Sequence, residues 1–206
     1  MYLGGLCFIT DNTYCNLSIS AMAEVALKAG IKFIQYRDKN AARRKIFEEA
    51  LTLRGLTARY RATLIINDYP DIALAVDADG VHLGQDDFPL REARKIMGGR
   101  IVGISTHDLA QAGEAEEGGA DYIGFGPVFH TTTKDAGAPR GLDFLKDVTE
   151  NVRIPVVAIG GINMDNMEAV FEAGADAVAV ATAICAGDMA GNARRFADLL
   201  QARSQR

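Results

Sequence analysis

The sequence predicts a closed (β/α)8 barrel, the TIM-barrel architecture, formed as a single domain over residues 1–206. Short runs rich in Val, Ile and Phe occur eight times, and each is followed by a segment with a helical pattern. These runs are continuously apolar, as strands covered on both faces are. The stretches "ADGVHL", "GGADYIGFG" and "AGADAVAVA" repeat one helix-to-strand turn. Eight alternating units favour a closed parallel barrel.

The predicted strands are spaced by roughly 26 residues, which is compact for a barrel of this kind. In chain order they read "LCFIT", "FIQYR", "TLIIN", "GVHLG", "RIVGIS", "YIGFG", "IPVVAIG" and "AVAVA". A doubly wound open sheet is the alternative. That fold normally has a glycine-rich fingerprint after its first strand, and "FITDNTYCN" contains none.

Eight helices are expected between and after these strands. In "SISAMAEVALKAG", Ser20 is the predicted N-cap of the first helix, and Gly30 is its predicted stop. The second helix, from about Ala41 to Tyr60, is predicted to be the longest. The third, after Pro70, is predicted to be short.

Composition restricts the possible partners and location. The chain has 206 residues, 49% of them hydrophobic and 24% charged, with a formal net charge of −5. This charge predicts binding to neither nucleic acid nor an anionic membrane, so an anion site has to be built locally. Three cysteines without CxxC spacing favour a reducing compartment, and no run is long enough for a signal peptide or a membrane helix. We therefore expect a cytoplasmic protein; a homo-oligomer remains open.

Acidic residues follow two neighbouring predicted strands. Asp68 comes after the third strand and Asp87 after the fourth. In a parallel barrel the carboxyl ends of the strands share one rim, so both carboxylates could reach one cation. Hard oxygen ligands suit Mg²⁺, whereas helix capping and turn formation are the alternative roles of these aspartates. Asn67 offers an amide to an oxyanion beside them.

The stretch "QYRDK" ends the second predicted strand. Alternation places Gln35, Arg37 and Lys39 on one face, with Tyr36 and Asp38 on the other. Two cations and an amide that point the same way suit a phosphate ester. A solvated strand end is the alternative.

The fifth strand ends in "GISTH". Ser105 could donate a hydroxyl hydrogen bond, but nothing in the sequence marks a paired base, so we do not predict a nucleophile. His107 could orient the loop, and His82, in the middle of a strand, is expected to be a hydrogen-bonded interior residue. His130 lies in a loop and is uninformative, and no His/Cys cluster has zinc spacing.

Three further segments reach the same rim. The loop "GPVFHTTTKDAGAPRG" contains Thr131, Thr133 and Lys134 and is long enough to close over a ligand. Gly160 and Gly161 end the seventh strand and permit close approach of backbone amides to a ligand. Ala181 and Thr182 follow the eighth strand, and the last two loops of such barrels often hold a monophosphate.

The rim is thus predicted to carry two anion-binding clusters. Arg37, Lys39 and Lys134, together with Asp68, Asp87 and one Mg²⁺, sum to three positive charges, which matches a diphosphate ester. The second cluster has no charged side chain and suits one phosphate. Two phosphorylated substrates predict a transfer reaction with diphosphate as the leaving group. No general base is needed before that group departs.

These motifs together resemble thiamine-phosphate synthase along nearly the whole chain, from "FITD" to "AVATAI". The specific parts are "QYRDK", "INDYPDIALAVDADGVHLGQDD", "GISTH", "GPVFHTTTK" and "AIGGI". The family is a compact (β/α)8 barrel. It joins 4-amino-2-methyl-5-hydroxymethylpyrimidine diphosphate to 4-methyl-5-hydroxyethylthiazole phosphate and releases diphosphate and thiamine phosphate. Its members are thought to ionise the pyrimidine diphosphate to a cation that the thiazole nitrogen captures.

The resemblance also implies roles for individual residues. It assigns the Mg²⁺ to Asp68 and Asp87, and catalysis to Arg37, Lys39, Ser105 and Lys134. The implied contacts of the pyrimidine diphosphate are Gln35, Tyr36, Arg37, Asp38, Lys39, Asn67, Ser105 and Lys134. Those of the thiazole phosphate are Thr131, Thr132, Thr133, the backbone of Gly161, Ala181 and Thr182. Thr182 stands where the family commonly has serine, and Ala181 where it has a larger aliphatic residue.

Three other readings remain. A thiazole tautomerase shares the barrel but typically lacks the full "TTTK" and paired-aspartate set. A catalytically silent ligand-binding relative need not keep a charge-balanced diphosphate site. Another phosphate-handling barrel enzyme is the third.

Overall fold

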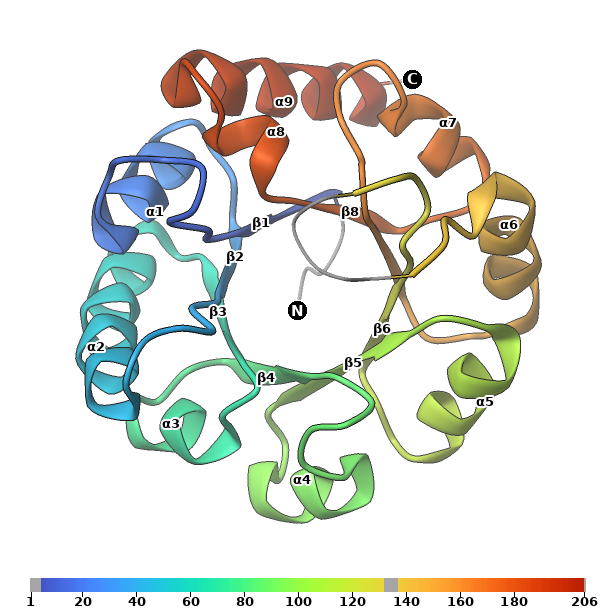
Figure 1. The fold of residues 1–206 in the computed structure, drawn as a ribbon, viewed down its shortest axis with the longest axis horizontal. Helices are drawn as coiled ribbons and strands as arrows, with labels where there is room; N and C mark the ends of the chain where they lie inside the picture. Colours follow the sequence, from blue (N-terminus) through green and yellow to red (C-terminus); the bar gives the residue numbers. More distant parts are fainter. Residues whose placement is uncertain (1–4, 132–136, 206) are drawn as a thin grey trace.

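In a computed structural model, the chain forms a closed barrel of eight parallel strands, β1 to β8 in sequence order, and β1 pairs with both β2 and β8 (Figure 1). The structure describes residues 5–131 and 137–205, apart from the side chain of Ser204. The strands are β1 (Gly5–Ile9), β2 (Phe33–Tyr36), β3 (Thr63–Asn67), β4 (Gly80–Leu83), β5 (Ile101–Thr106), β6 (Tyr122–Phe125), β7 (Val156–Ile159) and β8 (Ala177–Val180). The predicted fold class is confirmed, and all eight predicted strands are present.

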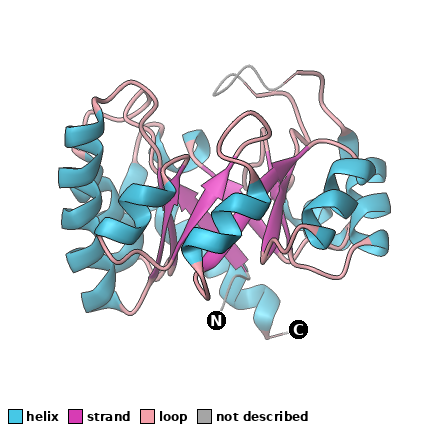
Figure 2. Cartoon of the chain, turned by 90° about the horizontal axis from the view of Figure 1, so that it is seen from below, coloured by secondary structure: helices cyan, strands magenta, loops and turns pink. Residues whose placement is uncertain are grey.

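Helices surround the barrel (Figure 1), and the side view shows them flanking the strands (Figure 2). They are α1 (Ile19–Lys28), α2 (Arg43–Tyr60), α3 (Pro70–Ala75), α4 (Leu90–Met97), α5 (Leu109–Glu117), α6 (Gly141–Asn151), α7 (Met167–Glu172), α8 (Thr182–Cys185) and α9 (Met189–Ser204). Within the described residues α2 is the longest helix and α3 is short, as predicted. None of the helices in this part of the chain is both long and apolar enough to span a bilayer.

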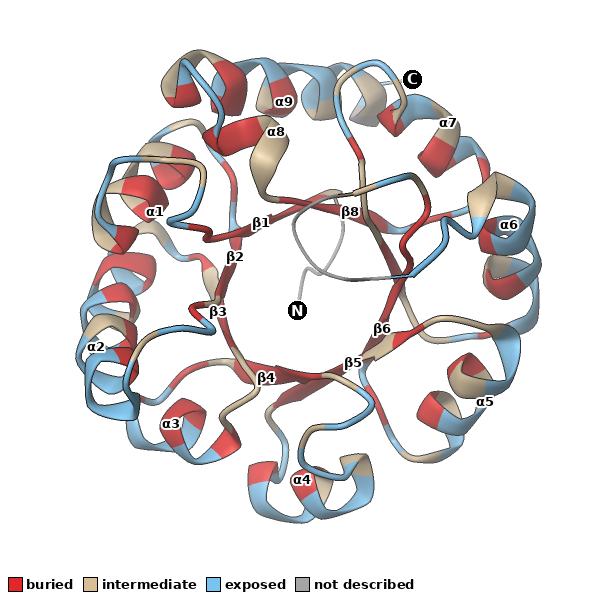
Figure 3. Cartoon of the chain, in the orientation of Figure 1, coloured by how far each residue is buried: buried red, intermediate tan, exposed pale blue. Residues whose placement is uncertain are grey.

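Two layers of buried side chains hold the fold together. Alternate strand residues such as Leu6 and Phe8 pack outward against the helices, and Cys7 and Ile9 point into the barrel. The strands are therefore buried on both faces, and the helices only on the side that faces the barrel (Figure 3). This double burial explains the continuously apolar strand runs.

The first helix begins earlier than predicted. Its N-cap is Ser18, whose Oγ accepts a hydrogen bond from the Ala21 N–H at 3.3 Å, and Ser20 lies within the first turn. Ile19 is fully packed in the core, which fixes the start of the helix. The predicted stop is supported: the helix ends at Lys28, and Gly30 follows with a φ of +99°.

The eighth unit contains two helices where one was expected. The short α8 follows β8 directly, and α9 begins afresh after Asp188. The Asp188 carboxylate accepts a hydrogen bond from the Gly191 N–H at 3.0 Å and so caps α9. Because α8 starts directly after β8, Ala181 and Thr182 stay at the rim of the barrel.

Candidate active site

A cavity of about 410 Å³ opens at the carboxyl ends of the strands, the end where the sequence places the chemistry. Every strand or the segment following it contributes to its lining. The residues are Ile9, Gln35, Arg37, Lys39, Asn67, Asp68, His82, Gly84, Asp87, Ser105, His107, Gly124, Gly126, Pro127, His130, Thr131, Ile159, Gly160, Gly161, Ile162, Asn163, Ala179, Val180, Ala181, Thr182, Ala183 and Ala186.

The end of β2 separates its side chains as the alternation predicts. Gln35, Arg37 and Lys39 line the cavity. Tyr36 points outward and donates to the Glu49 carboxylate at 2.7 Å, and Asp38 accepts hydrogen bonds from two backbone N–H groups of the loop that follows it. Tyr36 and Asp38 are absent from the cavity lining. The resemblance implies that both contact the substrate, and here their side chains could contribute only indirectly, by holding the loop in shape, or their backbone atoms could make the contact.

The two predicted metal ligands lie beside one another in the cavity. Asp68 has a left-handed backbone with a φ of +68°, and one of its carboxylate oxygens lies 3.5 Å from the Lys39 ammonium. Asp87 accepts a hydrogen bond from the Gly84 N–H at 2.6 Å. Burial and the adjacent Asp87 carboxylate raise the pKa of Asp68 to about 6, and Lys39 opposes this rise.

This donor set fits Mg²⁺. The described residues contain no group of three or more His, Cys, Asp and Glu side chains that could enclose a metal, so a zinc-type site is not formed there. Two carboxylates are what Mg²⁺ commonly takes from a protein, since waters and substrate phosphate complete its octahedral shell. A divalent cation between them would also relieve the repulsion between the Asp68 and Asp87 carboxylates.

The raised pKa predicts that Asp68→Asn stabilises the metal-free protein at alkaline pH. The folded pKa of about 6 exceeds the ordinary value, so Asp68 stabilises the fold most below about pH 4, where it is protonated in both states. That contribution is lost as the pH rises through 6, whereas Asn stays neutral. Urea unfolding in EDTA near pH 8 should show a gain of up to about 3 kcal/mol over wild type, and no gain near pH 4. Asp86→Asn, at an exposed neighbour, is the control; equal stability of Asp68→Asn and wild type near pH 8 would contradict the prediction.

The end of β5 contains a pair that the sequence did not reveal. Ser105 Oγ lies 2.9 Å from His82 Nε2, so the serine does have a histidine partner. The prediction that His82 is a hydrogen-bonded interior residue is confirmed, because it is 8% exposed and also contacts Tyr122. His107 Nδ1 lies 2.6 Å from the Gly126 carbonyl oxygen and ties the loop after β5 to the loop after β6, which supports its predicted orienting role.

The loop after β6 reaches the cavity through Thr131 and His130. His130, which the sequence left without a role, is therefore a missed lining residue; its position in a loop carries no pattern that could have identified it. The predicted residues Thr132, Thr133 and Lys134 lie outside the described residues.

The glycine pair after β7 is required by packing. A Cβ atom on Gly160 would lie 2.6 Å from Pro127 Cα, and one on Gly161 would lie 2.4 Å from the His130 carbonyl oxygen. Both residues also have positive φ values, which favour glycine. The pair thus lets the loops after β6 and β7 lie in direct contact. Gly160 and Gly161 line the same cavity as Arg37, and so do Ala181 and Thr182, which follow β8.

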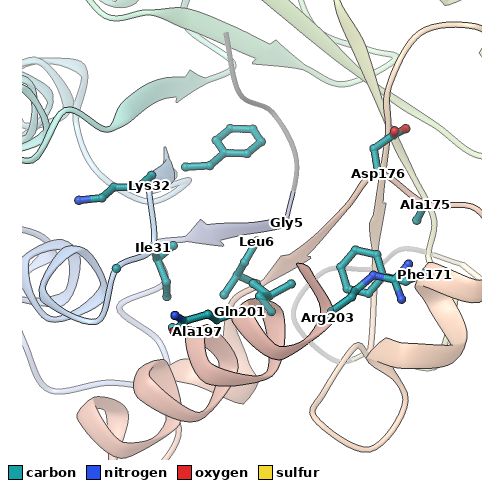
Figure 4. Close-up of a pocket in the computed structure, with 13 residues that line it drawn as sticks. Gly5, Leu6, Ile31, Lys32, Phe171, Ala175, Asp176, Ala197, Gln201 and Arg203 are labelled. Carbon is teal, nitrogen blue, oxygen red and sulfur yellow. The ribbon is translucent and has the colours of Figure 1, made fainter. Parts of the chain in front are cut away.

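A second cavity, of about 470 Å³, lies at the opposite end of the barrel between β1, β2, α7 and α9 (Figure 4). Its charged lining residues already have partners. Lys32 donates a hydrogen bond to the Tyr60 carbonyl oxygen. Arg203 pairs with Glu168 and stacks on the Phe171 ring. This cavity is larger than the first, but it lacks the convergent polar groups of a reaction site.

Known proteins resemble this chain over most of its length. The family model described as thiamine monophosphate synthase matches residues 6–184. The thiamine-phosphate synthase of Chloroflexus aurantiacus is 53% identical over 169 residues, which cover 82% of this chain and 78% of that protein. The enzyme of the same name from Halalkalibacterium halodurans is 48% identical, with 90% of each chain covered. The solved thiamine phosphate pyrophosphorylase from Pyrococcus furiosus has a TM-score of 0.89 at 40% identity and covers 96% of both chains. This chain belongs to the thiamine monophosphate synthase family.

Proposed function

We propose that the protein is a thiamine-phosphate synthase that joins the pyrimidine diphosphate to the thiazole phosphate and releases diphosphate. The observation that carries the proposal is the division of one cavity into two sides. The side from β2 to β4 carries Arg37, Lys39, Asp68 and Asp87, and the side from β7 and β8 is bordered by neutral residues and backbone. One side suits a diphosphate with its cation, and the other suits a second, monophosphorylated substrate.

The residues of the first side would hold the leaving group. Arg37 offers a planar fork of donors and Lys39 a point charge, and we propose that Lys134 adds a third cation. Asp68 and Asp87 would hold Mg²⁺, whose chemical contribution when bound is to neutralise the charge that develops on the departing diphosphate.

The pyrimidine ring would lie deeper, against Gln35, Asn67 and Ser105. Gln35 is buried and Ser105 is half-buried, so their hydrogen bonds to the ring would be made with little competition from water. They would orient the ring so that the carbon that loses diphosphate faces the thiazole nitrogen, which then captures the cation. No protein base is required before that capture.

The second side would hold the thiazole phosphate. The backbone of Gly161, Ala181 and Thr182 borders this part of the cavity, and Thr131 reaches it from the loop after β6. We propose that Thr132 and Thr133 complete this site. A cytoplasmic location is consistent with this function and remains a prediction, whereas the oligomeric state remains open.

The function is tested by supplying both substrates with Mg²⁺ and measuring thiamine phosphate and diphosphate together. A synthase forms the two in equal amounts. A thiazole tautomerase would isomerise the thiazole phosphate without releasing diphosphate, and a silent binding relative would form neither product. Either of those outcomes would overturn the proposal.

The two-sided cavity predicts that Thr182→Val weakens binding of the thiazole phosphate and leaves the pyrimidine diphosphate nearly unaffected. Loss of one hydrogen bond to a charged group corresponds to roughly 1.5–3 kcal/mol, or about ten- to a hundredfold in dissociation constant. Equilibrium titration of each substrate measures the effect. Thr52→Val, which removes an exposed hydroxyl from the outer face of α2, is the matched control. Equal weakening of both substrates would show that β8 does not border a separate monophosphate site.

A further inference from the structure

A chain of three polar side chains runs from the barrel interior to the cavity. Tyr122 Oη lies 2.9 Å from His82 Nδ1, and His82 Nε2 lies 2.9 Å from Ser105 Oγ. Tyr122 is 1% exposed, whereas Ser105 and one edge of His82 line the cavity. The three residues come from adjacent strands β4, β5 and β6, so barrel closure brings them together.

The neighbouring backbone is shaped to receive these rings. A Cβ atom on Gly103 would lie 2.1 Å from Tyr122 Cζ, and one on Gly124 would lie 3.0 Å from His82 Cε1. In the strand register Gly103 lies between His82 and Tyr122, and Gly124 lies opposite Ser105. The interior of such barrels is usually filled by branched apolar side chains. Here the rings of His82 and Tyr122 fill the space beside Gly103 and Gly124.

The protonation state of Tyr122 allows its hydroxyl to donate a hydrogen bond. Burial holds the pKa of Tyr122 well above its usual range, so its hydroxyl keeps its single proton. Gln35 opposes this rise. With the Tyr122 proton directed to His82 Nδ1, the proton of a neutral imidazole would lie on Nε2.

This arrangement differs from a nucleophilic triad. In a triad, a carboxylate beside Nδ1 stabilises the imidazolium that forms when the serine loses its proton. Here Nδ1 faces a neutral hydroxyl, and in this tautomer Nε2 would donate to Ser105 instead of accepting from it. The lone pair of Ser105 that faces His82 would then be occupied, and the Ser105 proton would point into the cavity.

We propose that His82 and Tyr122 are positioning residues that fix Ser105 as a hydrogen-bond donor to the pyrimidine diphosphate. The inference rests on the proposed function for the identity of the acceptor. It adds two residues, neither of which the sequence assigned to the site, and it defines the tautomer of His82.

The tautomer is measured in the ligand-free protein labelled with ¹⁵N-histidine, at a pH where imidazoles are neutral. Two-bond ¹⁵N–¹H correlations distinguish Nε2–H from Nδ1–H, and His82→Gln identifies the signal. Wild type should show Nε2–H for His82, and Tyr122→Phe should lose this preference. An Nδ1–H tautomer in wild type, or the same tautomer distribution in Tyr122→Phe, would overturn the proposal.

Binding of the pyrimidine diphosphate tests the consequence. Ser105→Ala and Tyr122→Phe should each raise its dissociation constant about three- to tenfold, and the double variant should be no weaker than Ser105→Ala alone. Dissociation constants for the thiazole phosphate should not change. If Tyr122 only supports packing, its loss will raise the dissociation constant by the same factor with or without Ser105. That result would contradict the proposed positioning of Ser105.

The control for removal of a tyrosine hydroxyl is Tyr60→Phe, at the far end of α2, where the ring lies beneath the Lys32 ammonium. It should leave both dissociation constants unchanged. If wild type fails to bind the pyrimidine diphosphate, the proposed function is wrong. The tautomer of His82 still tests whether His82 and Tyr122 position Ser105. If Tyr122→Phe does not fold, the wild-type tautomer alone decides.

Discussion

Arg37→Ala should slow diphosphate release in a single turnover by about 10²–10³, the effect typical of losing one preorganised group that stabilises developing charge. Arg37 projects into the cavity from the end of β2, and its backbone N–H donates to Thr10 Oγ1 at 3.0 Å, which fixes that strand end. A guanidinium that extends from this strand end into the cavity would stabilise the leaving group with little reorganisation. Binding of the thiazole phosphate, on the other side of the cavity, should change little.

Rapid-quench measurement of diphosphate with enzyme in excess isolates this step from product release. Arg44→Ala is the matched control, because that side chain is 91% exposed on α2 and pairs with Glu48 in the next turn of the same helix. A near-normal single-turnover rate for Arg37→Ala would show that Arg37 is a solvated charge at the rim.

Asp87→Asn should reduce turnover by about 10²-fold or more at limiting Mg²⁺ and recover in part when Mg²⁺ is raised. Removal of one of two carboxylates weakens the cation site, and charge stabilisation by a bound metal amounts to several kcal/mol. Asn keeps an oxygen that can accept from the Gly84 N–H, so the loop after β4 should retain its shape. The measurement is turnover as a function of Mg²⁺ concentration.

The neighbouring aspartate provides the control for this change. Asp86 is exposed and absent from the cavity lining, so Asp86→Asn removes the same charge one residue away. Its Mg²⁺ dependence should match wild type. If Asp87→Asn also matches wild type, Asp87 acts as a turn residue and the metal assignment is wrong.

Much of this site could be predicted because strand ends are local features. An apolar run that ends in a polar residue places that residue on the rim of a parallel barrel, and parity then decides which side chains point inward. This reasoning brought Arg37 and Lys39 to the cavity and placed Tyr36 and Asp38 outside it. It also placed Asp68 beside Asp87, since the two strands are adjacent.

What the sequence could not show depends on register between strands and on competition between equivalent local signals. Ser18 and Ser20 are both suitable helix caps, and only the burial of Ile19 decides between them. The pair of His82 and Ser105 needs the stagger of β4 against β5, which no local pattern reveals. A glycine such as Gly103 within an apolar strand was the available signal, because it marks room for a large side chain from the next strand.

The central claim is that the diphosphate and the metal lie on the β2–β4 side of the cavity. A crystal structure with the pyrimidine diphosphate and Mn²⁺ in place of Mg²⁺ tests it directly, since the anomalous signal of Mn²⁺ locates the cation. We expect the Mn²⁺ peak between the carboxylates of Asp68 and Asp87, with diphosphate oxygens on it and on the Arg37 guanidinium. A diphosphate bound at Gly161 and Thr182, or a Mn²⁺ peak away from both aspartates, would contradict the account.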